Sequence, residues 1–170
     1  MLDAALMGDI ARAVSDSFEK VVRQRESQVL RTAYRILGNW ADAEDVGQEV
    51  FVRLHRRGVE FPSDGACGAW IYRVTVNLCL DRRRAAHPTE ELGELPCGKA
   101  SAEAAAIRGE QSRKLMAALA ALPKRERAAV VLREIEGLST AEVAAILGSA
   151  EGTVRSQVAH ALTRLRRMLR

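Results

Sequence analysis

The sequence predicts an all-α protein in which two small helical domains are joined by a flexible linker. Of its 170 residues, 48% are hydrophobic and 4% are aromatic, and the commonest types are mostly strong helix formers. Apolar side chains recur at helical spacing on both sides of a central stretch that lacks this periodicity. No apolar run approaches the roughly 18 residues of a membrane span, and the N-terminus does not resemble a signal peptide. We therefore expect a soluble, cytoplasmic protein.

The first predicted domain spans residues 1–85 and begins with two helices. The first helix stops at Gly38 and carries an apolar stripe made of Phe18, Val22, Val29, Ala33, Ile36 and Leu37. Asn39 is expected to cap the second helix, with Asp42 as its reciprocal acid. The buried face of this helix is predicted to contain Val46, Val50 and Leu54.

A third helix is predicted from about Ala66 to Arg84, after a break at residues 62–65. Its inward face is expected to hold Trp70 or Ile71, together with Val74 and Leu78. Residues 86–102 contain two prolines and two glycines with little apolar periodicity, so they are predicted to form the linker.

The second predicted domain spans residues 103–170. Its first helix is expected to bury Leu115, Leu119 and Leu122 and to end at Pro123, and its second to end at Gly137. Either Ser139 or Thr140 caps a short helix, Gly148 makes a tight turn, and Ser149 is predicted to cap the last helix. The core stripe of the last helix is predicted to be Val154, Val158, Ala161, Leu165 and Met168.

Charge is unevenly distributed along the chain. The net charge is +4, yet residues 86–110 carry −3 and residues 111–170 carry +6. A basic C-terminal third is typical of a nucleic-acid-binding module. Cys67, Cys79 and Cys97 show no CxxC spacing, and the histidines are scattered, so we expect structural thiols and no metal site.

Three offsets in the C-terminal third predict a helix-turn-helix. Ala144 is small where two helices would cross, Gly148 suits a left-handed turn, and Val154 would pack beneath the second helix. Many helical hairpins share part of this pattern, so a purely structural hairpin is the alternative to DNA binding. Between Gly148 and Leu162 the only cation of lysine or arginine type is Arg155, although affinity for DNA comes largely from cations set against phosphates.

Two further motifs accompany this one. The stretches YRILGNWADAEDVGQEVFVRLHRR and WIYRVTVNLCLDRRR precede the linker, and ALAALPKRERAAVVLREIEGLSTAEVAAILGSAEGTVRSQVAHALTRLRRML follows it. Together and in this order they resemble the extracytoplasmic-function sigma factors of bacterial RNA polymerase. The resemblance covers nearly the whole chain apart from the linker.

The resemblance implies a function for each domain. The first domain is similar to sigma domain 2, whose second helix docks on the β′ clamp helices of core RNA polymerase. The matching positions are Asp42, Glu44, Asp45, Gln48, Glu49 and Val52. The third helix resembles the segment that recognises and melts the −10 element, with Arg73, Asn77, Arg82, Arg83 and Arg84 along the DNA. A loop before this helix holds a flipped base in the family, which places that role in GVEFPSDGACG without naming its pocket residues.

The second domain is similar to sigma domain 4, which reads the −35 element and also contacts the β flap. The implied DNA-facing residues are Glu151, Gly152, Thr153, Arg155, Ser156 and His160. A solvated histidine is the simpler interpretation of His160. The chain departs from the family pattern at Gly47, at Val76 and in the low charge of the last helix, where Gln157, His160 and Leu162 replace basic residues. Weak contacts suffice if the polymerase holds both domains on the DNA at once.

The implied partners are core RNA polymerase, promoter DNA and an anti-sigma factor, with no small-molecule substrate. No phosphate-cradling glycine loop, HExxH pattern or nucleophile–base pair predicts catalysis or a cofactor. Two alternatives remain at this level. One is a stand-alone helix-turn-helix regulator, which would require a dimerising first domain and palindromic sites. The other is a protein-interaction scaffold with a degenerate second domain.

Overall fold

The computed structural model describes residues 4–82 and 102–170, with side chains from residues 15 and 109 onward in these two segments. Every regular element in these segments is helical. The N-terminal unit, as we call the first three helices, consists of α1 (Ala4–Leu37), α2 (Trp40–Arg57) and α3 (Asp64–Asp81). The C-terminal unit consists of α4 (Ala102–Ala120), α5 (Lys124–Val130), the π-helical turn η1 (Val131–Ile135), α6 (Thr140–Leu147) and α7 (Glu151–Met168). The all-helical prediction is confirmed, whereas most of the predicted linker lies outside the described residues.

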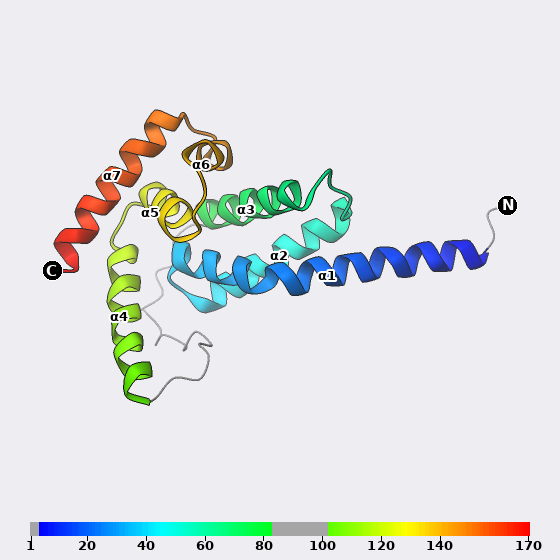
Figure 1. Ribbon diagram of the computed structural model, residues 1–170, viewed down its shortest axis with the longest axis horizontal. Coiled ribbons are helices and arrows are strands. Elements are labelled where there is room, and N and C mark those ends of the chain that lie inside the picture. The colour runs from blue at the N-terminus through cyan, green and yellow to red at the C-terminus, as the bar shows by residue number, and fades with distance from the viewer. Residues whose placement is uncertain (1–3, 83–101) are drawn as a thin grey trace.

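The two units pack against each other in one body. Helix α1 is a long rod against which both α2 and α3 pack, and the C-terminal unit gathers around its C-terminal end (Figure 1). Helices α4 and α5 contact α1, while α5 and α6 contact α3. Among the described helices, none combines the length and the apolar character that a membrane span requires.

The helix starts follow from local sequence. The Asn39 side chain accepts a hydrogen bond from the Asp42 N–H at 3.0 Å and Ser63 caps α3 in the same way. The predicted capping box at Asn39 is only half formed, because the Asp42 carboxylate accepts from Arg82 at 2.7 Å. The predicted core residues Val46, Val50 and Leu54 are all buried.

Gly47 is explained by the crossing of α1 and α2. It is buried, and a Cβ atom at this position would lie 2.9 Å from Cδ2 of Leu30. A glycine inside a helix costs about 1 kcal/mol relative to alanine. Here the missing side chain permits a close approach of α1 and α2. The sequence alone did not predict this contact.

Several predicted positions are wrong by a residue or a turn. Helix α3 ends at Asp81 instead of Arg84, because Arg82 adopts an extended conformation and turns its side chain toward α2. Leu119 and Leu122 are buried as predicted, but Leu115 is exposed and the neighbouring Met116 is buried instead. Ala150, not Ser149, occupies the N-cap of α7, and Ser149 Oγ lies 3.4 Å from the Leu147 carbonyl instead. Met168 is 44% exposed, so packing ends one turn before the apolar stripe does.

Cys67 and Cys79 are free and buried, as expected for structural thiols. Burial raises the pKa of Cys79 to about 12, so this thiol stays protonated at neutral pH. Cys97 lies outside the described residues.

Candidate polymerase and promoter surfaces

The outward face of α2 carries an acidic stripe. We call it the docking stripe; it consists of Asp42, Glu44, Asp45, Gln48, Glu49 and Val52. Glu44, Asp45, Gln48 and Val52 lie on the side of α2 away from its buried apolar residues, whereas Asp42 and Glu49 flank the buried face and are half-buried. Val52 is 41% exposed, so an apolar side chain follows the acids along the same surface. Carboxylates in the first turn also benefit from the positive end of the helix dipole.

The acids of the docking stripe already have partners within the chain. Arg82 donates to Asp42 at 2.7 Å and to Asp45 at 3.3 Å. Trp40 Nε1 donates to Glu44 at 2.9 Å, and Arg53 Nε donates to Glu49 at 2.7 Å. These contacts hold the carboxylates in place. They are also partly exposed, and a cation from another protein competes with them readily.

The exposed face of α3 holds two of the five predicted −10 residues. Arg73 and Asn77 both project from this face. Arg73 Nη2 donates to the Ala145 carbonyl of α6 at 2.7 Å. Arg82 lies at the C-cap beside the docking stripe, and Arg83 and Arg84 lie outside the described residues.

Val76 is fully buried in α3. Its apolar character therefore serves the core and removes no cation from the DNA-facing side. This departure from the family pattern is structural.

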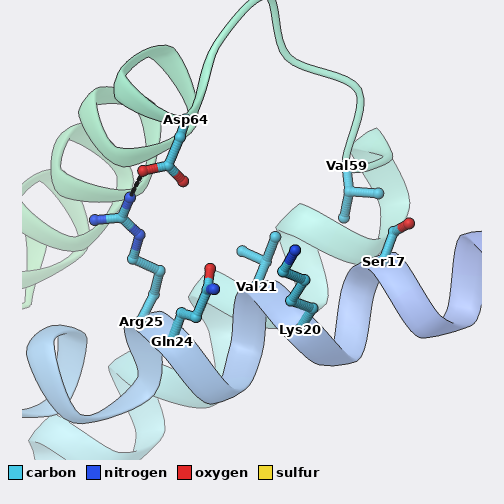
Figure 2. Close-up of a pocket in the computed structure, with 7 residues that line it drawn as sticks. All are labelled: Ser17, Lys20, Val21, Gln24, Arg25, Val59 and Asp64. Carbon is cyan, nitrogen blue, oxygen red and sulfur yellow. Dashed lines mark hydrogen bonds and ion pairs between the residues drawn. The ribbon is translucent and has the colours of Figure 1, made fainter.

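An open cleft lies between α1 and the start of α3. Its volume is about 540 Å³, and its walls are Ser17, Lys20, Val21, Gln24, Arg25, Val59 and Asp64 (Figure 2). Arg25 and Asp64 form an ion pair of 2.5 Å at one end of it. Lys20 and Gln24 add hydrogen-bond donors from α1, so the cleft suits a polar or anionic group. Val59 and Asp64 belong to the loop for which a base-capturing role was predicted.

Helices α6 and α7 form the predicted helix-turn-helix. Ser139 and Glu142 make a complete capping box at the start of α6, which decides between Ser139 and Thr140. Gly148 ends α6 with φ +59° and ψ 42°, the left-handed conformation that the turn requires. Ala144 is buried at the crossing and Val154 is fully buried beneath α7.

The N-terminal half of α7 is the exposed part of this motif. All six predicted −35 residues are exposed, namely Glu151, Gly152, Thr153, Arg155, Ser156 and His160. Glu151 accepts from Arg155 at 3.4 Å, and Ser156 Oγ donates to the Gly152 carbonyl at 3.1 Å. Further along, Arg164 pairs with Glu126 of α5 at 3.4 Å. Part of the charge at the far end of the helix thus serves packing within the unit.

Comparison with known proteins identifies the family to which this chain belongs. Residues 21–89 match the family model described as Sigma-70 region 2, and residues 112–165 match Sigma-70, region 4. The ECF RNA polymerase sigma factor SigM of Mycobacterium tuberculosis (strain H37Rv) is 37% identical over 170 residues, covering 98% of this chain and 84% of SigM. The chain belongs to the ECF sigma factors. SigE of Mycolicibacterium smegmatis is 41% identical over 161 residues, and the match covers 91% of this chain and 62% of SigE.

Solved sigma-factor structures share the fold. CnrH, solved in complex with the cytosolic domain of CnrY, aligns with a TM-score of 0.68 and 25% identity over 94% of this chain and 93% of CnrH. RpoE of Bartonella quintana, solved with the anti-sigma factor NepR, aligns with a TM-score of 0.64 and 22% identity, over 89% of this chain and 96% of RpoE. With regions 2 and 4 present in order, this ECF sigma factor acts in promoter recognition, and the stand-alone regulator is not favoured.

One group of polar residues in this sigma factor was not predicted. Glu136, next to η1, accepts hydrogen bonds from Thr32, Arg35 and Tyr72 of the N-terminal unit. Burial, together with the Glu136 carboxylate, raises the pKa of Tyr72, so its hydroxyl remains a donor. In the sequence, the polar Thr32 beside the apolar positions Val29 and Ala33 could have indicated a buried polar contact. It could not have indicated Glu136 as the partner.

Proposed function

We propose that the N-terminal unit binds core RNA polymerase through the docking stripe and engages the −10 element through α3, while the C-terminal unit reads the −35 element through α7. The expected contacts on the enzyme are the β′ clamp helices and the β flap. The main support is that one chain presents both an exposed acidic stripe on α2 and a helix-turn-helix whose leading residues are exposed. A stand-alone regulator needs only the second of these surfaces.

The chemistry of the docking stripe fits a basic partner surface. Asp42, Glu44 and Asp45 place negative charge near the start of α2, where complementary cations steer association. Val52 supplies an apolar contact further along. Charge then governs approach, and the apolar side chain adds contact area once docked.

The low charge of α7 fits a module that does not work alone. Arg155 is the only lysine or arginine on its exposed N-terminal half. Each phosphate contact that a protein lacks weakens its binding and flattens its salt dependence. A polymerase that holds both units on the same promoter raises the effective concentration of each, so weak contacts act together.

The proposed role is non-catalytic and cytoplasmic, because it is exercised on RNA polymerase. An anti-sigma factor is proposed as a further partner. The supporting precedent is that RpoE of Bartonella quintana was solved with NepR and that CnrH was solved with the cytosolic domain of CnrY.

Titration of the full chain against core RNA polymerase, followed by transcription from genomic promoter fragments, tests the proposal. Changing Asp45→Asn together with Gln48→Ala should weaken core binding about tenfold, a typical effect for a few interface contacts. Glu60→Gln, an exposed acid outside the stripe, is the matched control and should bind as the wild type does.

The same titration separates the other interpretations. Tight binding to duplex promoter DNA without core polymerase would favour the stand-alone regulator. Core binding with no transcription from any fragment would favour the scaffold. Either result would contradict the proposal.

A further inference from the structure

The helix-turn-helix of the C-terminal unit has no excess of positive charge. From Ser139 to His160 it contains two acids, Glu142 and Glu151, and one arginine, so its formal charge is −1 with histidine neutral. The arginine, Arg155, pairs with Glu151 at 3.4 Å. Duplex DNA is densely charged, and cations set against its phosphates supply most of the affinity that does not depend on sequence. A helix-turn-helix with this charge needs a cation from another part of the unit to bind DNA.

Helix α5 brings such a cation to the turn between α6 and α7. This helix packs against α7 (Figure 1), and its residue Arg125 is exposed. Nη1 of Arg125 donates a hydrogen bond to Oγ of Ser149 at 3.5 Å. Ser149 lies between the turn residue Gly148 and Ala150, which is the N-cap of α7. The guanidinium therefore lies beside the start of the helix that is proposed to read the −35 element.

The two other cations of α5 are engaged with backbone carbonyls. Lys124 Nζ donates to the carbonyl of Arg82. Arg127 is buried, and its Nη1 donates to the carbonyl of Ile36 at 2.7 Å. These contacts direct both side chains into the protein. Arg125 is thus the cation of α5 that is placed to meet a ligand at the turn.

Among the residues that the structure describes, no acid pairs with Arg125. The neighbouring acid, Glu126, is only 15% exposed and pairs with Arg164 of α7 at 3.4 Å. The hydrogen bond to Ser149 goes to a neutral hydroxyl, and at 3.5 Å it is longer than the usual range of about 2.7–3.2 Å. It uses one of the five N–H donors of the guanidinium. Arg125 therefore keeps its charge and most of its donors available to an acceptor outside the chain.

The two arginines near the turn are expected to contact different parts of the DNA. Arg155 projects from the exposed half of α7, whereas Arg125 belongs to α5 and reaches the turn that precedes α7. In helix-turn-helix proteins one helix enters the major groove, and residues outside it hold the DNA backbone. A guanidinium has a planar set of donors that matches the oxygens of a phosphate. Base-edge contact is thus the expected role of Arg155, and phosphate contact is the expected role of Arg125.

We propose that Arg125 binds a backbone phosphate of the duplex beside the −35 element and so supplies the positive charge that α6 and α7 lack. Ser149 holds the guanidinium at the turn until the phosphate replaces this long hydrogen bond. Arg125 then fixes the C-terminal unit on the duplex and reads no base. The inference rests on the proposed function, because it takes the −35 duplex as the ligand of the C-terminal unit.

Equilibrium binding of a labelled promoter fragment to the full chain with core RNA polymerase tests the inference. Fluorescence anisotropy measures the affinity of each variant between about 50 and 200 mM salt. The fragments carry either an intact −35 element or one with a single base change. Arg125→Gln removes the cation, and Arg125→Lys keeps it. Arg113→Gln, which removes an exposed cation from α4, is the matched control.

Arg125→Gln should weaken binding about fivefold on every fragment and reduce the slope of log affinity against log salt by about 0.9, the share of one phosphate contact. The order of preference among the fragments should stay the same. Arg125→Lys should keep the wild-type slope, because a lysine ammonium also binds phosphate. Arg113→Gln should match the wild type. Circular dichroism checks that each variant keeps its helical content.

Three results would overturn the inference. Arg125→Gln could leave the salt slope unchanged, which is what a purely structural role predicts, or it could change the preference among the fragments, as a base-reading residue would. Arg125→Lys could also lose as much slope as Arg125→Gln. A wild-type chain that still directs core polymerase to the promoter in these cases leaves the proposed function intact. A wild-type chain that does not bind core polymerase removes both proposals.

Discussion

At the residue scale, two glycines are expected to affect the stability of the fold in opposite directions. Gly148 has φ +59° at the turn between α6 and α7, where an L-residue is strained. Gly109 lies in α4 with open space around its Cβ position. Gly148→Ala should therefore lower the free energy of unfolding by about 1 kcal/mol, while Gly109→Ala should raise it by about 0.5–1 kcal/mol. Urea unfolding followed by circular dichroism measures both, and the same sign for the two variants would contradict the assignment.

A second residue-scale prediction concerns the capping box of α6. The hydrogen bonds that Glu142 makes with Ser139, to its side chain and then its backbone, lower the pKa of Glu142. The carboxylate is thus favoured more in the folded than in the unfolded state, and its stabilising contribution is complete above the ordinary glutamate pKa. As pH falls through the lowered pKa, the contribution is lost. The difference in melting temperature between wild type and Glu142→Gln should be constant from pH 6 to 8 and shrink toward about pH 3; growth of the difference on acidification would contradict this.

At the element scale, helix existence was predictable and helix ends were less so. Asn39, Gly148 and the period of the apolar stripes determine α2, the turn and α7 locally. The end of α3 was wrong because it depends on Arg82 contacting α2 and on Lys124 from the other unit. Such contacts join residues far apart in the chain, so no local pattern contains them. The packing of the two units against each other was missed for the same reason.

The functional-site residues also divide into those that a local sequence pattern predicts and those that depend on contacts between distant residues. The exposed face at the start of α7 could be predicted from helical spacing, whereas the docking-stripe residues were predicted from the resemblance to the family. The hydrogen bonds to Glu136 join residues from α1 and α3 to the residue that follows η1, and only the tertiary structure brings them together. A polar residue among apolar positions of a helix indicates a buried polar contact. The sequence does not indicate which residue completes that contact.

The element-scale prediction separates the two ends of α7. Arg155→Ala should lower transcription about tenfold from promoters that depend on the −35 element, since one cation that contacts DNA contributes about 1–3 kcal/mol. Its exposed pair with Glu151 contributes little to stability, so folding should be unchanged. Arg167→Ala, exposed at the far end of the helix, is the control and should leave transcription near the wild-type level. Run-off transcription with intact and altered −35 elements measures this, and loss of core binding by Arg155→Ala would show that the roles are assigned wrongly.

At the scale of the whole molecule, the chain combines surfaces that are each weak alone. The docking stripe is engaged by the chain's own cations, and the exposed half of α7 carries a single arginine. Both features fit a subunit that acts only when it is bound to a larger enzyme. Binding of both units to one enzyme raises their effective concentration at the promoter, so weak contacts suffice.

The most direct measurement of this claim is a footprint on one promoter fragment at near-physiological salt, with the chain alone, core polymerase alone, and the two together. The account predicts protection of the −35 and −10 regions only in the combined sample, with Arg155→Ala reducing protection at −35 more than at −10. Full protection of these regions by the chain alone, at the same concentration, would contradict it.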